Sequence, residues 1–232
     1  MKKHIFTCCL SLMILSCTKE NDLGVLKGDI IGEVNLLDQY GYQEKDMSGT
    51  TVTISNDEFS ATIVTDELGS YKVQNVPFGV YNTKYEHNGY LERTPEKIKH
   101  IGGASATLST YNMDQIPTYE VHLDSVVKQS HDIYAYGKML NITKKPQYGY
   151  GFAFRFFISG NEQVSKDNYT NSVTGYGMLT TGTNIRIRID WFDQNKGTFF
   201  LRPYALITSY YHRSDYLKAL GNSSDIFQCT LN

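Results

Sequence analysis

The chain has 232 residues, of which 41% are hydrophobic and 13% aromatic, so it can bury a sizeable core. Its 22 lysines and arginines against 24 aspartates and glutamates give a formal net charge of -2, and without a basic run nucleic acid is not an expected partner. Eighteen tyrosines and 11 phenylalanines against a single tryptophan favour strands over helices. We therefore expect an all-β protein.

The first 17 residues, MKKHIFTCCLSLMILSC, combine two lysines, an apolar run from Ile5 to Leu15 and a serine before Cys17. The run is too short to span a bilayer. Its end resembles the lipobox of bacterial lipoproteins, although Ile14 stands where that motif usually has leucine. The resemblance implies that residues 1–16 are a lipoprotein signal peptide and that Cys17 becomes the acylated first residue. Residues 17–25 would then be a lipidated tether.

Such an anchor predicts an outer membrane lipoprotein of a Gram-negative bacterium. The segment Thr18–Asp22 resembles the surface-export signal of some of these lipoproteins, but it also matches any short polar linker. A cell-surface and a periplasmic orientation therefore both stay open. Once the signal is removed, Cys17 and Cys229 are the remaining cysteines, so we expect a fold without disulfides.

From Leu26 to Met113 the chain consists of short alternating segments divided by turn residues, with no sustained helical period. This pattern predicts a β-sandwich over residues 26–113. Five pieces within it resemble the carboxypeptidase regulatory-like domain, in matching order and spacing: Gly32–Val34, Gly49–Ile54, Thr65–Tyr71, Val76–Tyr81 and Gly89–Tyr90. The resemblance implies a transthyretin-like, seven-stranded sandwich that serves as an accessory module and carries no catalytic residues.

A boundary is expected within Ser109–Tyr119, where alternation lapses and Pro117 would interrupt a ladder. Residues 118–232 would form a second sandwich. A polar stretch, Ser159–Thr174, is expected between its strands, which we predict at Tyr119–Val127, His131–Ile142, Tyr148–Ile158 and Asn184–Asp190.

The segment TFFLRPYA, Thr198–Ala205, resembles a strand of the fibronectin type III-like modules of bacterial surface proteins. It departs from them at Phe199, which lacks the hydroxyl of the tyrosine corner. The fold prediction is thus two consecutive β-sandwich domains, the second fibronectin type III-like or Ig-like.

Within PQYGYGFAFRFFISG, rings at every second position from Tyr148 to Phe156 form one stripe along a strand. Leaving the whole stripe in water would expose a patch prone to aggregation, so the central rings are expected in the core. Tyr148 and Tyr150, which carry hydroxyls near the strand end, are expected at a rim where a ligand would contact them.

The loop segment Ser209–Asp225 is the main ligand-binding candidate, because it gathers rings and hydrogen-bonding groups that suit a sugar. Its candidate residues are Tyr210, Tyr211, His212, Arg213, Asp215 and Tyr216. The alternative is that one or two of these tyrosines complete the packing and the rest are solvated. The segment Asp38–Gly49 has the same character with fewer rings.

Motifs of catalysis and metal binding are missing from the sequence, including H-E-x-x-H, C-x-x-C, G-x-S-x-G and the phosphate-binding loop. We expect no catalytic residues, no metal and no cofactor. The leading hypothesis is a lipid-anchored accessory module for glycan capture or adhesion beside a nutrient transporter or hydrolase. The alternative is a structural or assembly protein that docks against another envelope protein through an edge strand.

Overall fold

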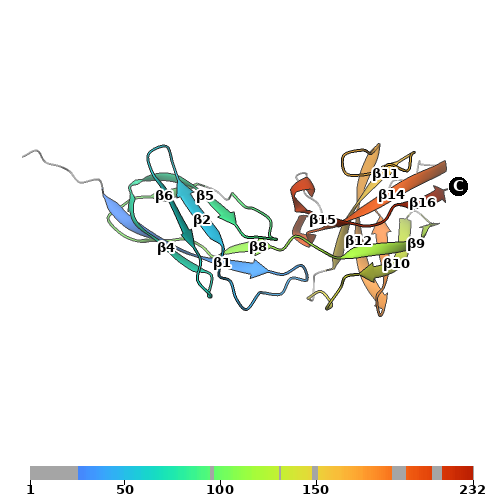
Figure 1. The fold of residues 1–232 in the computed structure, drawn as a ribbon, viewed down its shortest axis with the longest axis horizontal. Helices are drawn as coiled ribbons and strands as arrows, with labels where there is room; N and C mark the ends of the chain where they lie inside the picture. Colours follow the sequence, from blue (N-terminus) through green and yellow to red (C-terminus); the bar gives the residue numbers. More distant parts are fainter. Residues whose placement is uncertain are drawn as a thin grey trace, which may run out of the picture.

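The computed structural model describes residues 26–94, 97–130, 132–147, 151–189, 197–210 and 216–231. Strands dominate this part of the chain, and its helices are two short 3-10 turns, η1 (Thr208–Tyr210) and η2 (Tyr216–Ala219). Two β-sandwiches follow one another along the long axis of the molecule (Figure 1). The all-β prediction is confirmed. No helix within these ranges is long and apolar enough to cross a membrane.

The first sandwich packs two four-stranded sheets around an apolar core. One sheet contains β1 (Lys27–Leu37), β4 (Ser70–Pro77), β7 (Ala106–Thr107) and β8 (Tyr111–Asp114). The other contains β2 (Thr51–Ser55), β3 (Ser60–Val64), β5 (Gly79–Glu86) and β6 (Ile98–His100). Alternate residues of β1 point inward, so Ile30, Val34 and Leu36 are buried between the sheets.

The first sandwich has eight strands, one more than its resemblance to the carboxypeptidase regulatory-like domain implies. The extra strand arises because β7 and β8 cover successive stretches of one edge of β1. β7 pairs with β1 at Ile30 and Ile31, and β8 pairs with it from Val34 to Leu37, both in parallel. Together they occupy the place of a single interrupted edge strand.

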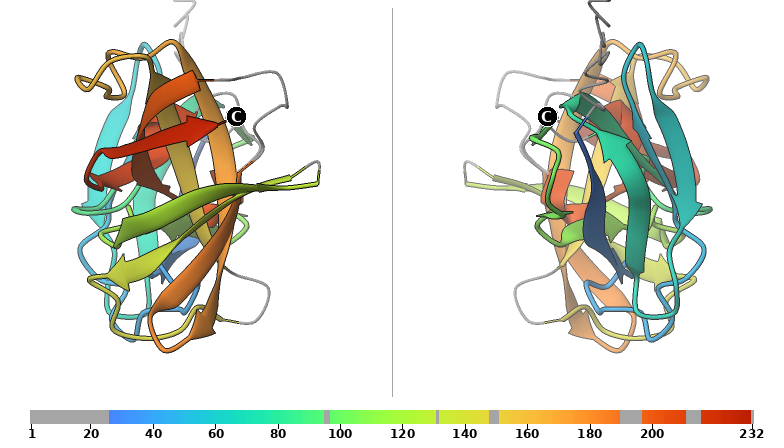
Figure 2. Two further views of the ribbon diagram at one scale, coloured as in Figure 1. Left: turned by 90° about the vertical axis from the view of Figure 1, so that its right-hand side faces the viewer. Right: turned by 90° about the vertical axis from the view of Figure 1, so that its left-hand side faces the viewer.

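The second sandwich is made by one eight-stranded sheet in the order β15-β14-β11-β12-β13-β10-β9, with β16 also paired to β14. Its strands are β9 (Glu120–Gln129), β10 (Asp132–Leu140), β11 (Phe152–Ser159), β12 (Asn171–Thr181), β13 (Asn184–Ile189), β14 (Gly197–Leu206), β15 (Leu220–Ser223) and β16 (Phe227–Leu231). The sheet curls until β9 approaches β14 and β16. In Figure 2 the yellow-green strands cross the orange ones steeply, so the sheet covers its own inner face.

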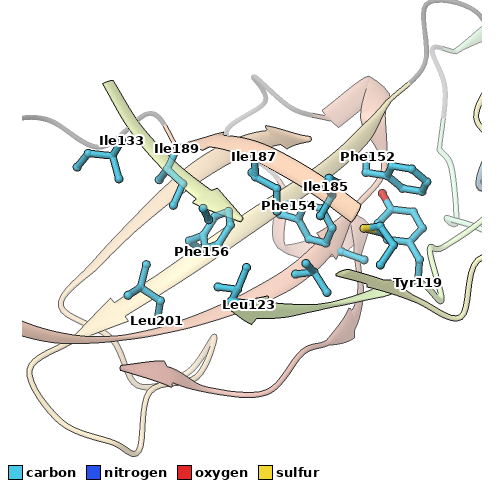
Figure 3. Close-up of a cluster of buried hydrophobic side chains, with 14 of the residues drawn as sticks. Tyr119, Leu123, Ile133, Phe152, Phe154, Phe156, Ile185, Ile187, Ile189 and Leu201 are labelled. Atoms are coloured by element: carbon cyan, nitrogen blue, oxygen red, sulfur yellow. The ribbon is translucent and has the colours of Figure 1, made fainter. Parts of the chain in front are cut away.

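The aromatic stripe of β11 lies in the core of the second sandwich, as predicted. Phe152, Phe154 and Phe156 are at most 1% exposed. Figure 3 shows Tyr119 beside Phe152 at one end of this core, and the two ring centroids are 5.0 Å apart in an edge-to-face contact. Cys229, the one cysteine among the described residues, is buried here and forms no disulfide.

The prediction of a polar stretch between strands at Ser159–Thr174 is wrong at its C-terminal end, because β12 begins at Asn171. The inward positions of β12 include Gly175 and Gly177, opposite Phe154 and Phe152 of β11. A Cβ atom at Gly175 would lie 2.6 Å from the Phe156 ring, so glycine is what leaves room for the large rings. These glycines remove the apolar alternation by which a strand is recognised.

The loop between β1 and β2 joins the two sandwiches. Tyr40 is 2% exposed and packs in the core of the second sandwich, edge-to-face against Phe152 with centroids 6.5 Å apart. The Thr143 backbone N–H donates to Tyr40 Oη at 3.0 Å. Asp38 forms an ion pair with Lys144, whose ammonium also lies 4.7 Å from the centroid of Tyr42. The rings of Asp38–Gly49, a ligand candidate in the sequence, are thus engaged in the junction.

Two more contacts reinforce the junction. Leu91, in the chain after β5, is buried against Ala153, Leu206 and neighbouring apolar residues of the second sandwich. Asp114, at the end of β8, binds Arg93 Nη2 at 3.0 Å and accepts a hydrogen bond from Ser209 Oγ at 3.1 Å. The two sandwiches therefore share an apolar and a polar contact besides the covalent link. The domain limits 26–113 and 118–232 themselves stay a prediction.

Candidate functional site

The outer face of the second sandwich carries rings and arginines on three adjacent strands. In β13, Ile185, Ile187 and Ile189 are buried, so the intervening Arg186 and Arg188 point to the solvent. The register places Arg188 between Tyr176 of β12 and Tyr134 of β10. Residues directly opposite one another across strands have their side chains on the same face, so these three form a cross-strand row.

A second row runs beside the first, with Arg186 between Met178 of β12 and Tyr136 of β10. The Arg186 guanidinium lies 4.9 Å from the centroid of the Tyr134 ring, in a cation–π contact that links the two rows. Tyr134 Oη donates to Asp132 at 3.2 Å, which fixes the ring from its other end. Met178 is 65% exposed and adds an apolar surface beside Arg186.

The residues of these rows other than Tyr136 line a depression of about 450 Å³, a size typical of small-ligand sites. Its lining residues are Tyr134, Tyr176, Met178, Leu179, Thr180, Arg186 and Arg188. Both charged side chains among them are arginines. A second depression, of about 230 Å³, shares Met178 and Leu179 with the first and adds Lys145 and Pro146. It is also lined by Gly151 and by Phe152 and Gly177, which face inward. The two together form what we call the outer-face groove.

The chemistry of the outer-face groove suits recognition of a ligand. Flat rings offer surfaces for the apolar face of a ligand, and guanidinium groups donate paired hydrogen bonds to hydroxyl or carboxylate oxygens. Within the described ranges, no three histidine, cysteine, aspartate or glutamate side chains are grouped so that they could hold a metal ion.

A further depression of about 480 Å³ lies in the first sandwich, lined by Glu86, His87, Tyr90 and Glu92 among others. Its polar groups already have partners. His87 Nδ1 lies 3.1 Å from Thr50 Oγ1, and Tyr90 Oη donates to Glu44 at 3.4 Å. Burial lowers the pKa of His87, so its ring is neutral near pH 7. The lining of this site contains no arginine, so it lacks the pairs of ring and guanidinium that line the outer-face groove.

Most ligand-binding residues predicted from the sequence lie outside the described residues. These are Tyr148, Tyr150, Tyr211, His212, Arg213 and Asp215, together with the side chain of Tyr210 and the lipidation residue Cys17. The segment Ser209–Asp225 is not one continuous loop, because Leu220–Ser223 forms β15 on the edge of β14. Of the six candidate residues in this segment, Tyr216 is the one whose side chain the structure describes.

Tyr216 packs on the outer face of β11 and β12. The Arg155 guanidinium lies 3.9 Å from the centroid of the Tyr216 ring, and Tyr216 Oη lies 3.2 Å from Ser172 Oγ. Burial opposes ionisation of Tyr216, but the Ser172 hydrogen bond and the Arg155 charge outweigh it and lower the pKa. A hydrogen bond to Tyr216 raises the pKa of Tyr169. Tyr216 is thus held by packing and hydrogen-bond contacts and is partly buried, while its role in ligand binding stays a prediction.

The sequence analysis did not identify the outer-face groove, although its signal is present. The alternation in NIRIRID places Arg186 and Arg188 on one face, and DIYAYGK places Tyr134 and Tyr136 on one face. Each pattern alone is typical of the solvent side of any one-sided sheet. Pairing of β10 with β13 brings the rings to the arginines, and a single sequence does not reveal that pairing.

No protein-family model matches the chain, and no curated protein matches it. Among solved structures, it is similar to a candidate carbohydrate-binding protein from Bacteroides uniformis, with 14% identity, 88% of this chain and 99% of the other covered, and a TM-score of 0.30. A DUF3823 family protein from the same species matches with 12% identity, coverage of 89% and 100%, and a TM-score of 0.31. The major pilin subunit of Bacillus cereus matches with 11% identity, coverage of 87% and 68%, and a TM-score of 0.39. Similarities this distant carry no argument about function.

Proposed function

We propose that the protein is a non-catalytic, lipid-anchored envelope protein that captures a glycan in the outer-face groove. In this role it is an accessory module beside a nutrient transporter or hydrolase, anchored through Cys17 in the outer membrane. The observation that carries the proposal is the pair of cross-strand rows in which Arg188 and Arg186 lie among Tyr176, Tyr134 and Met178. The half-buried rings of Tyr134 and Tyr176 and the exposed Met178 offer a concave apolar surface that a ligand can cover.

The shape and charge of the groove define the glycan further. Its two depressions adjoin, so the groove accommodates consecutive residues of a chain better than a single sugar. The charged residues that line it, Arg186, Arg188 and Lys145, are all basic. An acidic polysaccharide, with carboxylate or sulfate groups, therefore fits this surface better than a neutral one.

The residues predicted from the sequence fit this proposal in different ways. Tyr148 and Tyr150 immediately precede Gly151, which lines the second depression, so we propose them as additional contacts at its rim. The segment Tyr210–Asp215 remains a separate proposed contact next to Tyr216.

Affinity electrophoresis in gels that contain acidic or neutral polysaccharides tests the proposal. We expect acidic polysaccharides to retard the wild type and Arg186→Ala or Tyr134→Ala to weaken that retardation about tenfold, because each variant breaks the cation–π pair. Tyr169→Ala is the matched control, since this 40% exposed tyrosine precedes the opposite end of β12, next to Tyr216. Retardation lost in the control alone would assign binding to the Tyr216 region instead.

A second candidate function, docking onto another envelope protein, is favoured by the edge strand β3. It lies at the end of its sheet and has no buried residue, and Val64 is 55% exposed. Such an edge can accept a strand from a partner. A photo-crosslinking residue in place of Val64 would then capture one protein on intact cells. The absence of a specific product would remove this candidate.

A further inference from the structure

An exposed apolar patch lies at the end of the first sandwich where β1 begins. Its side chains are Leu26, Phe78, Val80 and Ile101, which are 62%, 61%, 51% and 66% exposed. They come from three segments of the chain that meet at this end. We call this group the apolar tip.

Backbone contacts show that the segments of the apolar tip adjoin. The Phe78 N–H donates to the carbonyl oxygen of Leu26 at 2.7 Å, and Val80 pairs with Lys99 two residues before Ile101. A Cβ atom at Gly102 would lie 2.8 Å from the Leu26 Cβ, so Ile101 and Leu26 lie in neighbouring segments. Exposed apolar side chains from adjoining segments form a surface that favours an apolar partner.

The position of the tip along the molecule indicates what covers it. Leu26 is the first described residue and belongs to the tip itself, and β1 runs from here toward the junction with the second sandwich (Figure 1). Eight residues lie between Cys17 and Leu26, so the chain from one to the other reaches roughly 30 Å at most. An acyl chain on Cys17 would therefore keep the apolar tip close to the bilayer at high effective concentration.

Charges around the tip are mixed. Lys27 and Lys99 are exposed beside it. The turn with the exposed Asp57 and Glu58 is also near, because a Cβ atom at Gly79 would lie 3.2 Å from the Asn56 side chain. Because acidic and basic groups balance, attraction to the headgroup charge is small and apolar insertion is the main contribution.

We infer that the apolar tip inserts into the lipid interface, so that the first sandwich stands on the bilayer and presents the second sandwich away from it. The inference rests on the lipid anchor at Cys17 that belongs to the proposed function. It adds a second membrane contact, made by folded side chains, and it fixes an orientation in which the second sandwich, which carries the outer-face groove, lies farther from the anchoring membrane than the first.

The test uses the mature lipidated protein in phosphatidylcholine liposomes, with an environment-sensitive fluorophore on a single introduced cysteine. The labelled variants are Phe78→Cys and Ile101→Cys at the tip. Leu68→Cys is the matched control, because Leu68 is an apolar residue at least as exposed as Phe78 and Ile101 and lies in a turn at the other end of the first sandwich. Gly69 of that turn bonds to Val34, seven residues along β1 from Lys27, or about 23 Å. The buried Cys229 does not compete for the label.

Nitroxide-labelled phosphatidylcholine should quench the labels at positions 78 and 101 several-fold more than the label at 68. Replacing part of the phosphatidylcholine with an anionic lipid should leave this difference unchanged. Equal quenching at all three positions, in protein that floats with the liposomes, would overturn the inference while leaving the anchor intact. Protein that fails to float would refute the anchor and the inference together. A tip label shielded on cells but not in liposomes would overturn the lipid contact in favour of a protein partner.

Discussion

Tyr40 provides a direct test of how the two sandwiches are joined, because it belongs to a loop of the first sandwich and its side chain is buried in the core of the second. Replacing this 2% exposed residue with alanine removes a ring that packs against Phe152 and leaves a cavity. Truncation of a buried aromatic ring costs about 3–5 kcal/mol, so Tyr40→Ala should lower the free energy of unfolding by about 3–4 kcal/mol. Tyr40→Phe keeps the ring and removes the hydroxyl that accepts from the Thr143 N–H and Oγ1, so it should cost about 1 kcal/mol.

Urea denaturation, followed by circular dichroism, measures both effects. Tyr42→Ala serves as the control from the same loop, since this 38% exposed ring contacts Lys144 and its loss should cost less than about 1 kcal/mol. We also expect Tyr40→Ala to separate a single transition into two, as the sandwiches lose their shared core contact. A Tyr40→Ala variant that unfolds like the wild type would refute the role of this loop in the junction.

Three further predictions concern the interior. Gly175→Ala should destabilise the fold by about 1–3 kcal/mol, because its Cβ atom would overlap the Phe156 ring. Gly160→Ala, at a position with open space around it, should leave the free energy of unfolding in urea unchanged. Equal stability of the two variants would contradict the packing described. Burial raises the pKa of the Cys229 thiol to about 11. In a chain that begins at Thr18, where Cys229 is the one cysteine, it should therefore react with a disulfide reagent at pH 8 only after unfolding, and rapid native-state labelling would disprove this. Burial also raises the pKa of Tyr71 and Tyr119, so the folded state holds their protons more tightly than the unfolded state does. The free energy of unfolding should therefore stay level up to about pH 10 and fall above it. Urea denaturation that shows constant stability through about pH 11 would contradict this.

The sequence was sufficient for the parts of the fold in which burial follows strand alternation. The rings of Phe152, Phe154 and Phe156 alternate with smaller residues, and their burial was predicted correctly. β12 escaped prediction because glycines occupy its inward positions, so the space it provides for those rings appears in the sequence as a lack of apolar residues. Because its inward positions are glycines, β12 has no periodic pattern of apolar residues by which it could be recognised.

The candidate site was less predictable for a related reason. Aromatic residues in loops indicated a ligand-binding site in the sequence. In the structure, however, Tyr40 is buried in the junction and the Tyr216 ring packs against the Arg155 guanidinium. The outer-face groove combines residues of β10, β12 and β13 that look like ordinary solvent-facing positions one strand at a time. Its character comes from long-range pairing, which brings Tyr134 beside Arg186 across 52 residues of chain.

A glycan array probed with the wild type and with the Tyr134→Ala, Arg186→Ala double variant tests the central claim most directly. Both residues lie on the outer face of the sheet, so melting temperatures of the two proteins should agree closely. We predict that the wild type is retained on acidic glycans and that the double variant loses this retention by at least about tenfold. Equal retention of the two proteins, or no retention of a well-folded wild type on any glycan, would contradict the assignment of the outer-face groove as a glycan-binding site.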